Sequence, residues 1–183
     1  MRIISGVHKG KKLIAPKNLS ARPTTDVAKE GLFNILNHRF DLSSLKVLDL
    51  FSGTGNISYE FYSRGCHNIT AVEQDRTACA FIKKIADQLA MDQLTVRCTK
   101  VESFLQSPST AFDIVFLDPP YAIGLAGYSK LITQLFDYQW ISEEGVVIAE
   151  HFTKDDLSEL NHFAEVKTYG SSSFSFFQKK SRS

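Results

Sequence analysis

Phe112-Asp113-Ile114-Val115-Phe116-Leu117-Asp118-Pro119-Pro120-Tyr121 is the stretch that decides the fold of this chain. Its first six residues are almost all apolar, which is typical of a parallel strand that is buried on both faces. Proline cannot donate to a sheet ladder, so the Pro-Pro pair ends the strand abruptly. Ligands of open α/β sheets bind beyond the carboxyl ends of the strands. The stretch therefore predicts an α/β fold with a functional site at residues 118–121.

The four residues of that site suit transfer to an amino group conjugated with a ring. Such a nitrogen is a poor nucleophile because its lone pair is delocalised. The Asp118 carboxylate and the Pro119 carbonyl are two acceptors for its N–H groups, and they can localise the lone pair for attack. Tyr121 offers an aromatic face for an unstacked base, worth about 1–3 kcal/mol. We therefore predict that the catalytic residues are Asp118, Pro119, Pro120 and Tyr121.

A second signal lies upstream, where residues 46–51 are followed by Ser52-Gly53-Thr54-Gly55-Asn56-Ile57-Ser58. This pattern predicts a strand, a glycine turn and a helix. Glu73 ends the next apolar run, where an acid that binds ribose hydroxyls belongs in a dinucleotide fold. The glycine fingerprint is incomplete, since Ser58 stands where a third glycine or alanine is expected. The turn alone is weak evidence, but together with Glu73 and the Asp118 segment it indicates a nucleoside cofactor.

The first twenty-two residues are basic and contain no acid, although the net charge of the whole chain is only +1. We expect a β-hairpin near residues 2–14 that turns around His8–Gly10. A basic patch beside a base-modifying site predicts phosphate binding. The alternative is a solvated hairpin whose charges keep an edge strand soluble. The candidate RNA-binding residues are Arg2, Lys9, Lys11, Lys12 and Arg22.

Length and composition favour one globular domain. The chain has 183 residues, of which 43% are hydrophobic and 22% charged, enough to bury a substantial core. No apolar run approaches the ~18 residues of a membrane span, and the first residues lack the apolar region of a signal peptide. We therefore expect a cytoplasmic protein. The three cysteines show no C-x-x-C spacing, so we expect reduced core or half-buried thiols, and the scattered histidines predict no metal site.

Strand and helix patterns alternate along the rest of the chain. A helix is expected to begin at Thr25 or Asp26, which are good capping residues. Residues 163–179 are expected to form two strands around Gly170. Such alternation predicts a parallel sheet with right-handed crossovers. The other expected strands lie near residues 46–51, 69–73, 94–98, 112–117 and 145–150, and the other helices near 55–64, 76–90 and 127–138.

The N-terminal segments Met1–Gly6, Gly10–Leu13, Arg22–Asp26 and Glu30–Leu36 are similar to the RsmD family of 16S ribosomal RNA guanine-N2 methyltransferases. The order of the later motifs resembles that of class I S-adenosylmethionine-dependent methyltransferases in general. The resemblance covers residues 1 to about 180. It implies a Rossmann-like fold with a mostly parallel seven-stranded sheet, an antiparallel C-terminal strand and a small N-terminal β-hairpin. The domain would span residues 1–183, with a hairpin extension (1–22) and a catalytic core (23–183).

The same resemblance implies roles for individual residues, with S-adenosyl-L-methionine as the cofactor. Asp49 would orient the glycine turn through backbone N–H groups, and Glu73 would accept both ribose hydroxyls. Glu102 would border the adenine, although a solvated helix position explains it equally well. Arg22, with Thr24 and Thr25, would close over the cofactor or touch RNA. The implied cofactor-binding residues are Asp49, Phe51, Gly53, Gly55, Glu73, Glu102 and Asp118.

The function that these features imply is methylation of the N2 amine of a guanine in 16S ribosomal RNA by in-line displacement. The expected substrate is a small-subunit assembly particle, and the expected enzyme is a monomer. An adenine-N6 methyltransferase of DNA or RNA uses the same four-residue motif and remains an alternative. A glutamine-amide methyltransferase prefers asparagine at the position of Asp118. A catalytically idle RNA-binding assembly module and a nicotinamide oxidoreductase are further alternatives, and the oxidoreductase would not explain residues 118–121.

Overall fold

The computed structural model describes residues 1–16, 19, 24–106 and 110–179. Within these ranges seven strands form one sheet in the order β3-β2-β1-β4-β5-β7-β6. The first five strands of that order are parallel, and β7 runs antiparallel to both of its neighbours. This is the sheet that the sequence predicts. The strands are β1 (Lys46–Leu50), β2 (Asn68–Glu73), β3 (Leu94–Cys98), β4 (Phe112–Leu117), β5 (Ile141–Phe152), β6 (Phe163–Tyr169) and β7 (Ser172–Gln178).

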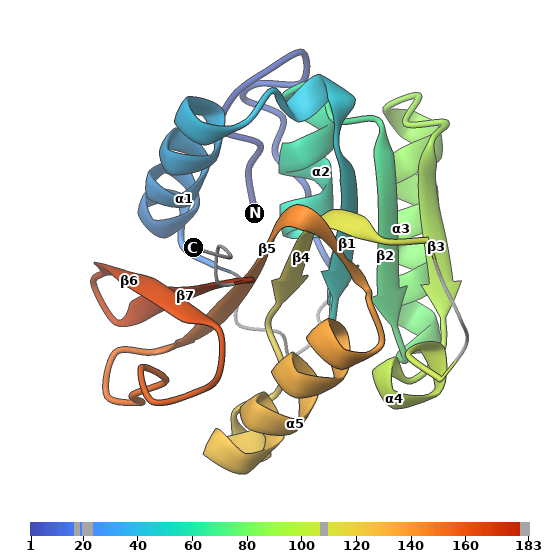
Figure 1. The fold of residues 1–183 in the computed structure, drawn as a ribbon. Helices are drawn as coiled ribbons and strands as arrows, with labels where there is room; N and C mark the ends of the chain where they lie inside the picture. Colours follow the sequence, from blue (N-terminus) through green and yellow to red (C-terminus); the bar gives the residue numbers. More distant parts are fainter. Residues whose placement is uncertain (17–18, 20–23, 107–109, 180–183) are drawn as a thin grey trace.

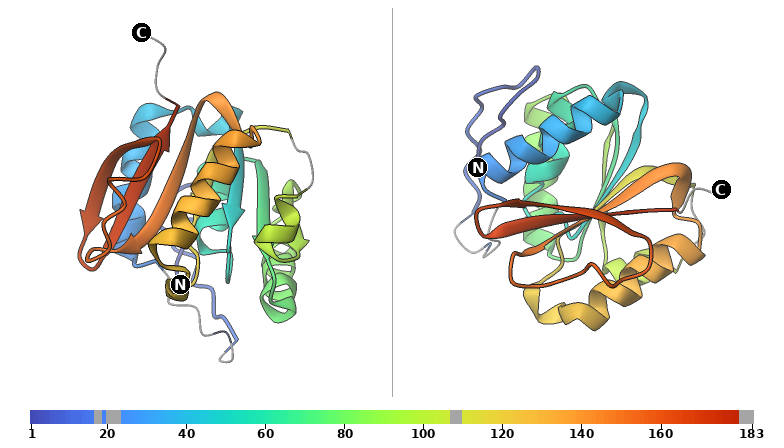
Figure 2. Two further views of the ribbon diagram at one scale, coloured as in Figure 1. Left: turned by 60° about the horizontal axis from the view of Figure 1, so that its bottom comes forward. Right: turned by 60° about the vertical axis from the view of Figure 1, so that its left-hand side comes forward.

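Helices cover both faces of the sheet. One face packs against α1, α2 and α3, and the other against α4 and α5; the right-hand view of Figure 2 shows the sheet between these two layers. The carboxyl ends of the parallel strands point toward one edge (Figure 1). The helices are α1 (Asp26–Arg39), α2 (Asn56–Ser63), α3 (Arg76–Gln88), α4 (Val101–Phe104) and α5 (Gly124–Asp137), with 3-10 turns η1 (Leu42–Ser44) and η2 (Tyr121–Ile123).

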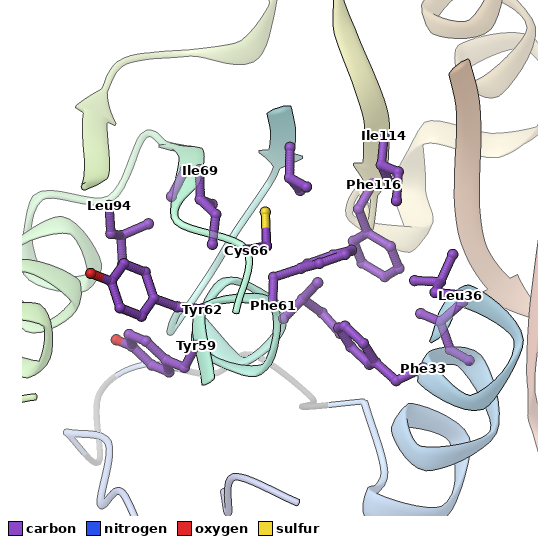
Figure 3. Close-up of a cluster of buried hydrophobic side chains, with 14 of the residues drawn as sticks. Phe33, Leu36, Tyr59, Phe61, Tyr62, Cys66, Ile69, Leu94, Ile114 and Phe116 are labelled. Atoms are coloured by element: carbon purple, nitrogen blue, oxygen red, sulfur yellow. The ribbon is translucent and has the colours of Figure 1, made fainter. Parts of the chain in front are cut away.

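The central strand β4 is buried on both faces, as its apolar run predicts. Phe116 faces the helices α1 to α3, where Phe33 and Phe61 pack edge to face with ring centroids 4.7 Å apart (Figure 3). Val115 and Leu117 face α5 on the other side. Alternating side chains thus serve two separate cores, which leaves only the end of the strand open to a ligand.

The predicted cap at the start of α1 is confirmed, and α3 has a side-chain cap that was not predicted. The Thr25 hydroxyl accepts a hydrogen bond from the Ala28 N–H at 3.2 Å, and α1 begins at the next residue. Asp75 accepts from the N–H of Thr77 at 2.7 Å at the start of α3. Side-chain caps of this kind satisfy N–H groups that have no partner within the helix.

Two elements have bounds that differ from the prediction, and one short helix was not predicted. Strand β5 spans Ile141–Phe152 and not 145–150, because β7 pairs with it as far as Phe152 and a register shift after Phe112 lets its first residues join β4. Helix α5 begins at Gly124 and not at residue 127, directly after the turn η2. The short helix α4 was not among the helices that the pattern predicted. The extent of β5 thus depends on its pairing with β4 and β7, not on local periodicity.

The N-terminal segment forms the predicted hairpin, although Arg2 and Lys12 make its one recorded antiparallel bridge. The hairpin lies along α2. The Glu60 carboxylate accepts from the N–H groups of Ile4 at 2.9 Å and Ser5 at 3.1 Å, and Val7 N–H donates to the Ser63 carbonyl at 2.8 Å. The hairpin turn is therefore fastened to the end of α2 that lies away from the carboxyl ends of the strands (Figure 1).

A buried ion pair holds the hairpin in this position. Lys29 and Glu60 are both fully buried, with Nζ and Oε2 3.2 Å apart. Lys29 Nζ also donates to the Arg2 carbonyl at 2.6 Å and to Asn56 Oδ1 at 2.9 Å. Burial lowers the pKa of Lys29, and the Glu60 carboxylate opposes that shift. Since an unpaired buried charge is strongly destabilising, the pair ties the hairpin, α1 and α2 into one unit.

Candidate active site

The glycine turn, Glu73 and the Asp118 segment meet in one cavity at the carboxyl ends of β1, β2 and β4. The cavity has a volume of about 420 Å³, within the range of about 300–1,000 Å³ that is usual for small-molecule sites. A neighbouring cavity of about 240 Å³ shares Phe51, Glu73, Gln74 and Pro120 with it. The larger cavity is lined by Leu19, Thr24, Asp49, Phe51, Ser52, Gly53, Thr54, Asn56, Ile57, Glu73, Gln74, Asp75, Ala78, Phe116, Asp118, Pro119, Pro120 and Tyr121.

Glu73, at the end of β2, holds the glycine turn. Its Oε2 accepts from Gly53 N–H at 2.8 Å, and its Oε1 accepts from the N–H groups of Gln74 at 2.8 Å and Asp75 at 2.9 Å. A carboxylate has about four acceptor positions, so Glu73 can still accept from hydroxyl groups in the cavity. Glu73, which is predicted to bind the ribose, thus also orients the glycine turn. That role was expected of Asp49.

Asp49 contacts the helix after the turn. Its Oδ2 accepts from Ser58 Oγ at 2.5 Å, and the Ser58 backbone N–H adds a second hydrogen bond. Burial raises the pKa of Asp49 to about 7, while the hydrogen bonds from Ser58 act in the opposite direction. The serine that interrupts the glycine fingerprint therefore has a clear role, because its hydroxyl satisfies a fully buried carboxyl group.

The backbone of the turn passes through left-handed conformations. Gly55, the N-cap of α2, has a φ of 82° and is buried; it does not line the cavity, although its neighbours Thr54 and Asn56 do. A Cβ atom there would come within 2.7 Å of the Tyr59 ring, so glycine is required on steric grounds. Phe51 has a φ of 60°, uncommon for a residue other than glycine, and it lines both cavities. No local sequence signal predicted that conformation, which is of a kind that clusters at functional sites.

Asp118 lies beside a second carboxyl group. Leu117 of β4 pairs with Ala149 of β5, which brings the next residues, Asp118 and Glu150, side by side. Glu150 is buried, and its Oε2 accepts from Thr24 Oγ1 at 2.6 Å. Burial, and then the charges of Glu150 and Asp49, raise the pKa of Asp118 well above that of an ordinary carboxyl group.

Glu150 was not among the predicted site residues, although a signal was present. Like Glu73, it is an acid that follows an apolar strand, at the edge where ligands bind. Thr24 also reaches this point, since it lines the cavity and donates a hydrogen bond to Glu150, whereas Thr25 caps α1. Arg22 lies outside the described residues.

Tyr121 forms the outer wall of the cavity. It belongs to the turn η2 and is 51% exposed. Its ring stacks on Phe152 with centroids 3.9 Å apart and an interplanar angle of 21°. Pro119 is buried and Pro120 exposed, and both line the cavity. The four predicted catalytic residues are thus brought to one wall of it.

Glu102 is exposed on α4 and lines the smaller cavity. The other walls of that cavity include the apolar side chains of Phe51, Val101, Pro120 and Ile123. Such a slot can take a flat ring, with one carboxylate at its border.

The lysines expected to bind RNA lie on the hairpin. Lys9, Lys11 and Lys12 are exposed. Arg2 is exposed as well, but it forms an ion pair with Asp26, with Nη2 and Oδ2 3.1 Å apart. The hairpin turn is held at the end of α2 that lies away from the strand ends, so Lys9 lies away from the cavity. Arg2 lies nearer to it, because its carbonyl accepts from Lys29, which also donates to the cavity residue Asn56.

The cysteines lie where the fold places them. Cys66 and Cys79 are buried as expected, but Cys98 is exposed because β3 is the edge strand of the sheet. Among the described residues, no group of three histidine, cysteine or acidic side chains is placed to hold a metal ion. In the same part of the chain, every helix is too short or too polar to cross a bilayer.

Several known proteins that are similar to this chain are named as methyltransferases. The family model described as Conserved hypothetical protein 95 matches residues 1–178. The putative rRNA methyltransferase YlbH of Bacillus subtilis is 33% identical, over 98% of this chain and 100% of its own length. The ribosomal RNA small subunit methyltransferase D of Escherichia coli is 33% identical, over 86% of this chain and 77% of its own. The solved structure of the putative methyltransferase yhhF from Escherichia coli superposes with a TM-score of 0.86 at 28% identity, covering 100% of this chain and 99% of that one.

Proposed function

Because this chain belongs to the RsmD family, we propose that it methylates the N2 amine of a guanine in 16S ribosomal RNA, with S-adenosyl-L-methionine as the methyl donor. The names of its relatives support ribosomal RNA as the substrate. The observation that carries the proposal is the meeting of Asp118, Tyr121 and Glu73 in one cavity. Asp118 and Tyr121 would bind the base in that cavity, and Glu73 would bind the ribose of the cofactor.

The chain's residues fit this cofactor by their chemistry. Glu73 would accept hydrogen bonds from the ribose hydroxyls. The slot between Phe51 and Pro120, bordered by Glu102, would hold the adenine. The N-terminal end of α2 would favour the cofactor's carboxylate, because helix N-termini attract anions. When bound there, S-adenosylmethionine supplies a methyl group on a positively charged sulfur.

The residues of the Asp118 segment would prepare the base for attack. The target amine would donate one N–H to Asp118 and the other to the Pro119 carbonyl, which turns its lone pair toward the methyl group. These residues would hold the amine in line with the methyl group, so that its nitrogen could bond to the methyl carbon while S-adenosylhomocysteine leaves and a proton is released. Holding the reactants in line lowers the barrier. Ionisation makes Asp118 a stronger acceptor, so its raised pKa ties the rate to pH.

The partner and setting follow from the same proposal. The lysines Lys9, Lys11 and Lys12 would contact phosphates of the RNA in a small-subunit assembly particle. The hairpin (1–22) would serve as a substrate-binding extension of a catalytic core (23–183). We expect the enzyme to act as a monomer in the cytoplasm.

The test is methyl transfer from labelled S-adenosylmethionine to small-subunit RNA, and to particles that lack the modification, followed by nucleoside analysis. We expect N2-methylguanosine, and no label with the Asp118→Ala variant. N6-methyladenosine would overturn the guanine assignment in favour of the adenine-N6 alternative. Label on neither nucleoside, with RNA binding intact, would favour an idle assembly module.

A further inference from the structure

Tyr121 is one half of an aromatic stack at the rim of the cavity. The other half, Phe152, is the last residue of β5. The two rings lie 3.9 Å apart, centroid to centroid, and are within 21° of parallel. Nothing in the sequence pairs these residues, which are thirty-one positions apart in the chain by their numbers.

The two rings have different surroundings. Tyr121 lines the cavity together with Asp118, whereas Phe152 stands behind it and is not part of the lining. One face of the Tyr121 ring is therefore covered by Phe152. A base that enters the cavity would meet the rest of the Tyr121 ring.

The two residues also differ in how firmly their backbones are held. Phe152 pairs with Ser172 of β7. Two residues earlier, the Glu150 carbonyl accepts from the Tyr128 hydroxyl of α5 at 2.7 Å. Tyr121 belongs to a 3-10 turn of three residues, and its side chain is half exposed. A residue on a paired strand can thus fix the orientation of one on a short turn.

We propose that Phe152 is a positioning residue for methyl transfer: it holds the Tyr121 ring at the orientation in which a base stacked on it presents its amine to Asp118. This inference rests on the proposed function. Phe152 acts through Tyr121 and touches neither the base nor the cofactor. Such support matters because a small misplacement of reacting groups lowers a rate strongly.

A double-mutant cycle tests the proposal, with the variants Phe152→Ala, Tyr121→Ala and the pair. Loss of one aromatic partner is expected to lower kcat/KM for RNA about three- to tenfold in Phe152→Ala. Cofactor affinity should stay within twofold or so of the wild type, since no cofactor contact is removed. The double variant should be no slower than Tyr121→Ala, because Phe152 has nothing left to position. Phe152→Tyr should restore the rate.

A second stack serves as the matched control. His162 packs on Phe136 with centroids 4.0 Å apart and an interplanar angle of 10°, in a polar groove whose lining shares no residue with the cavity. His162 has a φ of 69°, a conformation that asparagine tolerates, so His162→Asn removes the stack without new strain. We expect this variant to keep the wild-type kcat/KM.

Two results would overturn the inference. If the losses of Phe152→Ala and Tyr121→Ala multiply in the double variant, Phe152 does not act through Tyr121. If His162→Asn slows transfer as much as Phe152→Ala does, the effect is general destabilisation. Failure of the proposed function gives a different result. It changes the nucleoside that carries the label, but it does not change whether the rate losses of the two single variants multiply in the double variant.

Discussion

At the residue scale, the site depends on carboxyl groups that burial has made reluctant to ionise. Asp118 and Glu150 stand side by side at the ends of β4 and β5, and Asp49 lies beneath the glycine turn. A negative charge on one of these carboxyl groups disfavours ionisation of the others, so their pKa values depend on how closely they are placed. Two predictions follow from the direction of these shifts.

The first concerns the pH dependence of the rate. The ionised form of Asp118 is the stronger acceptor for the amine, and its raised pKa places the acid limb of kcat/KM well above the range of an ordinary carboxyl group. Glu150→Gln removes a neighbouring charge but keeps an acceptor for Thr24, so the pKa of Asp118 should fall and the acid limb should move to lower pH. A pH profile of single-turnover transfer measures this shift. Glu143→Gln, at an exposed residue of β5, is the control and should leave the limb in place. An unmoved limb in Glu150→Gln would contradict the assignment.

The second concerns stability. The pKa of Asp49 is about 7 in the folded chain against 3.8 for an ordinary aspartate, so between these values the folded state binds more protons than the unfolded state. The free energy of unfolding should therefore fall as pH rises from about 4 to about 7. Asp49→Asn removes this group while its amide oxygen can still accept from Ser58, and its profile should be shallower, with a slope left by Asp118. Denaturant midpoints across this range test the point, and parallel profiles would contradict it.

At the element scale, the hairpin along α2 carries exposed lysines that lead away from the cavity. Its polar backbone is bound by Glu60 and Lys29, which leaves Lys9, Lys11 and Lys12 exposed to contact a partner. Replacing these three lysines by glutamine should therefore weaken RNA binding without disturbing the cofactor. Each lost phosphate contact should reduce the slope of log K for RNA binding against log salt concentration by up to about 0.7–0.9.

In kinetic terms, the same triple variant should raise KM for RNA and keep kcat near the wild-type value at saturating substrate. Binding titrations at several salt concentrations, together with initial rates, measure both effects. Lys83→Gln, at an exposed position of α3, provides a matched charge control. If the triple variant leaves the salt slope and KM unchanged, the hairpin is a solubilising edge and not a phosphate-binding surface.

The elements themselves were largely predictable, and their boundaries were not. Apolar runs identified the core of the sheet, and Thr25 marked the start of α1, because burial on both faces and helix capping leave local patterns. The length of β5 was missed because it depends on β7, a partner distant in sequence. The bond from Gly53 to Glu73 and the stack of Tyr121 on Phe152 were missed for the same reason.

At the scale of the whole molecule, the sheet brings two functions to one edge. The ends of β1 and β2 carry the groups suited to a cofactor, and the ends of β4 and β5 carry those suited to a base. One cavity joins the two halves, so each half can be disabled while the other remains. This division is the central claim about the site.

The rate of a single turnover at saturating cofactor tests that division most directly. Glu73→Ala removes an acceptor for two hydroxyls and should weaken cofactor binding by about 1.5–3 kcal/mol, as calorimetry would confirm, yet saturating cofactor should recover much of its rate. Asp118→Ala should bind the cofactor within a few-fold of the wild-type affinity and remain inactive at every cofactor concentration. Recovery of Asp118→Ala at high cofactor concentration, or unchanged cofactor binding in Glu73→Ala, would contradict the account.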